Sequence, residues 1–94
     1  MGDNMRNEEI KVLIDLLGEN EVVVYFVTKK GIGRTMYCTR DLQLIPENQQ
    51  DGINDPKLNG DLIVAVYDFD NCDWRSFRKD AVFEYKVIAV DYDL

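Results

Sequence analysis

The side chains best suited to binding chemistry follow one another in one short segment: Trp74, Arg75, Phe77, Arg78 and Lys79. An aromatic ring beside a cation can stack on a nucleic-acid base or hold an anion. Side chains alternate between the two sides of a strand, so Trp74 and Arg78 are expected on one face. Arg75 and Phe77 are then expected on the other face. The segment is therefore the first candidate for a binding site.

The same residues also have a purely structural interpretation. Large rings commonly fill protein cores, so core packing is favoured over ligand stacking for Trp74 and Phe77. Arg75 and Arg78 fit ion pairs with the many acidic residues as well as they fit a ligand. If a basic patch exists, the first predicted hairpin extends it with four further cations: Lys29, Lys30, Arg34 and Arg40.

The chain lacks the side chains on which enzymatic catalysis most often depends. The chain contains no histidine, the commonest general base and the commonest metal ligand. Ser76 is the only serine, so a Ser-His-Asp arrangement is excluded. Cys38 and Cys72 have no histidine partner, and two thiols do not complete a structural zinc site. We therefore predict a non-enzymatic protein that needs no cofactor.

Three aspartates near one predicted turn are the remaining candidates for metal binding: Asp68, Asp70 and Asp73. A calcium-binding loop places oxygen ligands at alternate positions and a glycine at its sharp bend. Here Cys72 stands at the third ligand position and no glycine follows. Solvated turn carboxylates are the favoured interpretation, and no metal site is predicted.

Composition and charge narrow the range of partners. The 94 residues suit a single globular domain spanning 1–94, and their net charge is −7. An acidic surface disfavours general attraction to nucleic acid or anionic membranes, but it leaves room for a local basic patch. Neither a signal peptide nor a membrane-spanning stretch is evident. We expect a cytoplasmic protein with free thiols and no membrane partner.

An amphipathic helix is predicted over residues 7–17. Its apolar side chains recur with helical spacing: Ile10, Leu13, Ile14 and Leu17. Asn7 suits the amino-terminal cap, and Gly18 suits the carboxyl-terminal one. So short a helix is not stable alone, so its stripe must pack on something. We expect it to cover one open end of a barrel; the alternative is a helix that binds a partner.

β-Branched and aromatic residues predict strands over residues 21–28, 34–39, 61–68, 74–78 and 81–90. Leu42, Leu44 and Ile45 are candidate buried residues between the second and third strands. The polar residues 47–60 predict a long loop that is either functional or mobile, with mobile favoured, and Lys79-Asp80 predicts one 3₁₀ turn. The fold class is mainly β: an SH3-like five-stranded small barrel, about 21–90, with one N-terminal amphipathic helix. An open α+β sheet with the helix across one face is the rival.

Longer motifs resemble a known family. The runs TMYCT at 35–39, LIP at 44–46 and WRSFRxDxV at 74–82 are similar to small phage proteins described as SH3 β-barrel fold-containing, over residues 22–88. That resemblance implies a phage-encoded barrel in the bacterial cytoplasm, with no assigned activity. The last run also resembles the closing segment of WYL domains, SH3/Sm-like modules that sense nucleic acids or nucleotides. This second resemblance implies that Arg75 and Arg78 face a ligand.

Two functions follow as hypotheses. The first is a non-enzymatic phage accessory module that binds a host bacterial protein, in host takeover or counter-defence. The second is a nucleotide or nucleic-acid binding module that uses Trp74, Arg75, Phe77, Arg78 and Lys79. A third idea, imitation of DNA by ordered carboxylates, requires a regular acidic stripe that the interspersed lysines and arginines disfavour.

Overall fold

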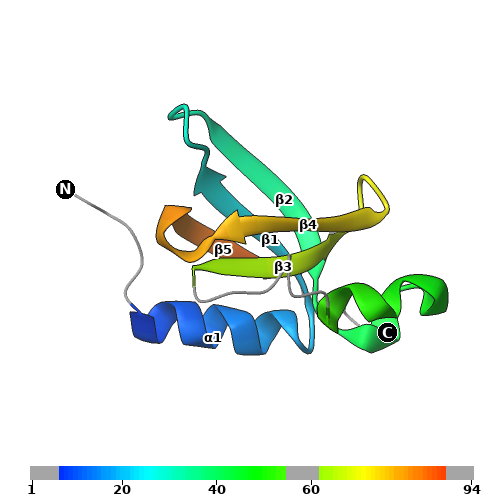
Figure 1. Ribbon diagram of the computed structural model, residues 1–94. Helices are drawn as coiled ribbons and strands as arrows, with labels where there is room; N and C mark the ends of the chain where they lie inside the picture. Colours follow the sequence, from blue (N-terminus) through cyan, green and yellow to red (C-terminus); the bar gives the residue numbers. More distant parts are fainter. Residues whose placement is uncertain (1–6, 55–61, 89–94) are drawn as a thin grey trace.

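A computed structural model describes residues 7–54 and 62–88, and it contains one α-helix and five strands. Figure 1 shows them in chain order: α1 (Asn7–Leu17), β1 (Glu21–Val27), β2 (Gly33–Thr39), β3 (Ile63–Asp68), β4 (Asp73–Arg78) and β5 (Val82–Ile88). Three 3₁₀ segments connect them: η1 (Leu42–Leu44), η2 (Glu47–Asn54) and η3 (Lys79–Ala81). The predicted mainly β class with one N-terminal helix is confirmed. Positions 61, 89 and 90, predicted as strand, lie outside the described residues.

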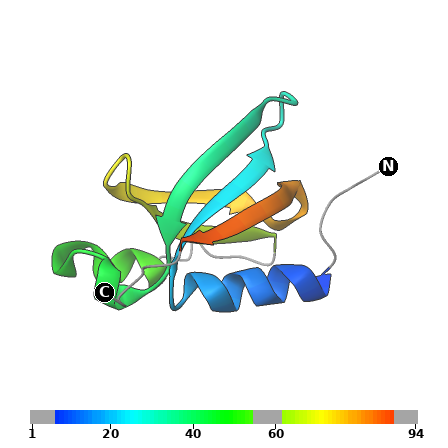
Figure 2. The same cartoon turned by 180° about the vertical axis from the view of Figure 1, so that it is seen from behind.

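All strands belong to one antiparallel sheet in the order β4-β3-β2-β1-β5, so β4 and β5 are its edges. β1 and β2 are paired along almost their whole length, from Val22↔Cys38 to Val27↔Gly33. β2 and β3 pair only at Cys38↔Asp68 and Thr39↔Tyr67. Figures 1 and 2 show the consequence: the far end of the β1–β2 hairpin diverges from the β3–β4 hairpin.

The core lies between α1 and the concave face of the curved sheet. Ile10, Leu13 and Leu17 of α1 are buried, and Ile14 packs beside them. The sheet contributes alternate residues, as period-two side-chain placement requires: Val22, Val24, Cys38, Val64, Val66, Phe77 and Val82. The helix therefore packs on its own sheet, and its stripe does not serve as an exposed partner-binding face.

Two expectations about residues 40–60 are wrong within the described part. Residues 47–54, predicted as mobile loop, form the 3₁₀ segment η2, because the Gln49 amide donates to the Pro46 carbonyl at 2.8 Å and further contacts fix the segment. Leu42 and Leu44 are 42% and 39% exposed rather than buried; only Ile45, at 3%, enters the interior. In a short 3₁₀ turn successive side chains point in different directions, so one of three apolar neighbours can be buried alone.

The thiols differ in environment. Both cysteines are free; Cys38 is buried and Cys72 is exposed. Burial raises the pKa of the Cys38 thiol to about 12, so almost none of it is thiolate at neutral pH. The described residues contain no group of three or more cysteine, aspartate or glutamate side chains placed to hold a metal ion. None of the described helices is long and apolar enough to cross a membrane.

Candidate functional site

The divergence of the two hairpins leaves an open cavity of about 440 Å³ next to the β2–β3 pairing, between β2 and the β3–β4 hairpin. Phe26 and Met36 form its apolar part, and both lie against the core cluster. Arg34 of β2 and Arg75 of β4 line it from two different strands. Arg34 is opposite Phe26 in the β1–β2 register, and Arg75 is opposite Val66, so both arginines lie on the concave face. We call this space the Arg34–Arg75 cavity.

The charge in this cavity is predominantly positive. Arg34 and Arg75 are exposed, and neither makes an ion pair with any residue in 7–54 or 62–88. Asp68 also borders the cavity, but its carboxylate accepts from the Asp70 amide (2.9 Å), the Asn71 amide (3.3 Å) and Asn71 Nδ2 (2.6 Å). Asp68 thus closes the β3–β4 turn, while the two guanidinium groups remain able to bind an anion.

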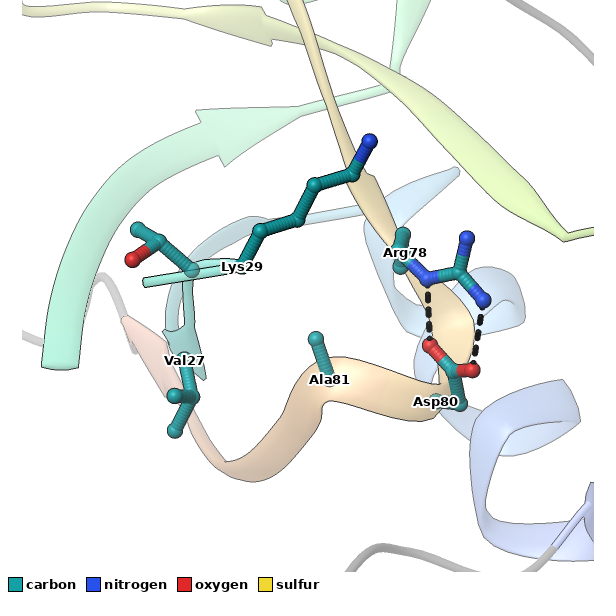
Figure 3. Close-up of a pocket in the computed structure, with 6 residues that line it drawn as sticks. Val27, Lys29, Arg78, Asp80 and Ala81 are labelled. Atoms are coloured by element: carbon teal, nitrogen blue, oxygen red, sulfur yellow. Dashed lines mark hydrogen bonds and ion pairs between the residues drawn. The ribbon is translucent and has the colours of Figure 1, made fainter. Parts of the chain in front are cut away.

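A second space lies beside the first, around the end of β1. Two adjoining cavities, of about 390 and 210 Å³, are both lined by Val27, Thr28, Lys29, Arg78 and Ala81. We call them together the Lys29–Arg78 cavity. Figure 3 shows the Lys29 side chain extending toward β4, where Arg78 lies.

Arg78 is held by an acidic neighbour. Its Nε and NH2 groups donate to the two carboxylate oxygens of Asp80 at 2.8 and 2.7 Å (Figure 3). The hydrogen bond from Arg78 lowers the pKa of Asp80, and the same contact raises the pKa of Arg78. Asp80 therefore stays ionised to a lower pH than an ordinary aspartate. Both side chains are about half exposed, so solvent weakens the pair and a competing anion can separate them.

The other predicted site residues have structural surroundings. Phe77 is 4% exposed, and its ring stacks on Phe26 at a centroid distance of 5.9 Å. The Lys79 amide donates to the Leu62 carbonyl at 2.9 Å, and the lysine lines neither cavity. Of the further cations, Arg40 lies elsewhere: it donates to the Ala65 carbonyl, and burial lowers its pKa. Lys29 lines the same cavity as Arg78, and Arg34 lines the same cavity as Arg75.

Trp74 packs on the convex side of the sheet, against η2. Its Nε1 donates to the Gln49 carbonyl at 2.6 Å, and its ring meets Tyr67 edge-on at 6.2 Å. A methyl group added at Gly52 would lie 2.1 Å from Trp74 Nε1, so the indole covers this glycine directly. Trp74 is partly buried and lies outside the core cluster, so its ring packs on η2 and does not fill the main core.

We expect Gly52→Ala to displace the indole, to break the Trp74–Gln49 hydrogen bond and to lower the free energy of unfolding by about 1–3 kcal/mol. Trp74 is the only tryptophan, so its fluorescence emission reports the change, with a shift to longer wavelength. Gly33→Ala is the matched control, because a methyl group there meets nothing within 4 Å. Equal spectra for both variants would contradict this packing.

Sequence reasoning missed the apolar lining of the cavity. Phe26 and Met36 were placed only on strands, because periodicity shows that a residue faces inward but not whether that part of the interior is filled. The one sequence feature that could have indicated this apolar lining was the first predicted strand, which is apolar on both faces.

Comparison with known proteins gives one result. A protein-family model described as WYL_2, Sm-like SH3 beta-barrel fold, matches residues 10–83. This span runs from α1 into β5 and includes every residue named above as lining the two cavities. No curated protein and no solved structure matches the chain. The predicted SH3-like barrel is thereby confirmed.

Proposed function

Since the chain belongs to the WYL_2 family of Sm-like SH3 β-barrels, we propose that it is a non-catalytic module that binds a nucleotide-type ligand. The single observation that carries this proposal is the Arg34–Arg75 cavity, where two cations without ion-pair partners among the described residues stand beside Phe26 and Met36. The ligand's phosphate would bind the guanidinium groups, and its base would pack on the apolar side chains. Both a nucleotide and a single-stranded nucleic acid have this chemistry.

The acidic net charge does not oppose this proposal. At physiological salt, charges more than about 8 Å apart in solvent are largely screened, so the local arginines dominate the field inside the cavity. The net charge of −7 instead limits non-specific attachment to duplex DNA over the whole surface. A small acidic protein with local basic cavities is thus suited to selective binding of a short anionic ligand.

We expect Arg75→Ala to weaken binding of a fluorescently labelled oligothymidylate about tenfold or more, because a hydrogen bond to a charged group contributes about 1.5–3 kcal/mol. Fluorescence anisotropy at low salt measures the dissociation constant. Lys86→Ala is the matched control, since Lys86 is exposed on β5 and lines neither cavity. If Arg75→Ala binds like the wild type, the cavity is not the ligand site.

We propose, as a second candidate function, a phage-encoded accessory that binds a host protein in the bacterial cytoplasm. Val27 and Phe83 favour it, because they are 40% and 43% exposed on neighbouring strands. The Phe83 ring lies 6.4 Å from that of Tyr25. Phe83→Glu should then abolish saturable capture of the host protein from bacterial lysate, and Arg75→Ala should not. Retained capture by Phe83→Glu would refute this second function.

A further inference from the structure

We propose that Lys29 and Arg78 form a second anion-binding subsite, so that the ligand is a strand with at least two separate phosphates and not a mononucleotide. This inference rests on the proposed function and specifies its ligand. The first phosphate would bind at Arg34 and Arg75, and the next would bind at Lys29 and Arg78, across the end of β1.

The two cavities adjoin one another. Phe26 and Thr28 line the Arg34–Arg75 cavity, and both also line part of the Lys29–Arg78 cavity. The proposed path from one space to the other passes over these last residues of β1. Thr28 lies at this crossing, and its backbone amide is already bonded to the Ile32 carbonyl at 2.9 Å.

The two pairs of cations are better matched to two phosphates than to one, because their arginines on β4 lie on opposite faces. Arg75 is opposite Val66 on the concave face, whereas Arg78 is opposite Ile63 on the other side of β4. Their Cα atoms are about 10 Å apart along the strand, and the two side chains leave it in opposite directions. Two cation pairs whose arginines lie on different faces of β4 fit two anionic groups joined by a linker.

Asp80 now holds the position that a phosphate would take at Arg78. Its two oxygens accept from Nε and NH2 in the paired geometry that guanidinium also offers to phosphate. Lys29, which has no ion pair among the described residues, reaches toward the same strand (Figure 3). Asp80 is therefore an internal competitor: a ligand must displace it, and its removal should favour binding.

The test measures competition with labelled oligothymidylate by unlabelled thymidine monophosphate, dinucleotide and longer oligothymidylate at low salt. We expect Lys29→Ala and Arg78→Ala each to weaken binding of the longer strand about tenfold and to leave monophosphate binding unchanged. Each variant should also make the salt dependence weaker: the negative slope of the logarithm of the association constant against the logarithm of the salt concentration should become shallower by about 0.7. Asp80→Asn should tighten binding of the longer strand about threefold.

The possible outcomes separate the two proposals. If Arg75→Ala weakens binding but Lys29→Ala and Arg78→Ala do not, the second subsite is refuted and the proposed function stands. If no thymidylate binds, or if Arg75→Ala has no effect, both are refuted. If Asp80→Asn weakens binding, Asp80 positions Arg78 and does not compete. Lys86→Ala should leave every value unchanged, and thermal unfolding confirms that each variant is folded.

Discussion

Leu13→Ala is expected to lower the free energy of unfolding by about 2–5 kcal/mol, the usual cost of removing a fully buried leucine side chain. Leu13 has 0% exposure, and it belongs to the core cluster to which α1 and all five strands contribute. In a small domain this is a large share of the total stability, so the urea midpoint should fall steeply. The measurement is urea unfolding followed by circular dichroism.

The neighbouring residue supplies the control for Leu13→Ala. Val12 is on the same helix but is 49% exposed, so Val12→Ala should change the free energy of unfolding by no more than about 0.5 kcal/mol. Similar losses in both variants would show that helix propensity, and not burial against the sheet, governs this position. A negligible loss in Leu13→Ala would mean that α1 does not cover the core.

Charge reversal should have the largest effect on binding. The double variant Arg34→Glu, Arg75→Glu replaces both cations of the Arg34–Arg75 cavity by carboxylates, which repel phosphate. We expect oligothymidylate affinity to fall more than about a hundredfold, since each lost charged hydrogen bond already costs about 1.5–3 kcal/mol. Because both arginines are exposed, the fold should persist. Fluorescence anisotropy at several salt concentrations measures the loss.

A matched double variant separates local from overall charge. Lys11→Glu, Lys86→Glu changes the net charge by the same amount at two exposed positions outside both cavities. It should reduce affinity only slightly, through the weak and screened field of distant charges. If both double variants lose affinity equally, overall charge governs binding and the cavity has no special part in it.

Sequence patterns predicted the helix and the strands well, because the formation of each of these elements depends mainly on residues that are close together along the chain. The stripe from Ile10 to Leu17 indicated α1, and strand alternation placed Arg75 and Arg78 on opposite faces of β4. Contacts between distant residues were not predictable in this way. The carbonyl that accepts from Trp74 belongs to Gln49, in a polar stretch that resembles a loop.

The site depends on a feature that no local pattern encodes. The cavity exists because β2 and β3 share only two residue pairs before they diverge. How far two strands stay paired depends on twist and packing over the whole sheet. The cations that line the cavity were visible in the sequence, but the association of Arg34 with Arg75, and of Lys29 with Arg78, needed the folded chain.

A titration of the isotope-labelled protein with short oligothymidylate, followed by backbone amide NMR shifts, tests the central claim most directly. We predict that the largest shifts lie around the two cavities, at Phe26, Thr28, Arg34 and Arg75, and that α1 and the convex side near Trp74 change little. Shifts concentrated on α1 or around Trp74, with the cavity residues unchanged at saturation, would contradict the account.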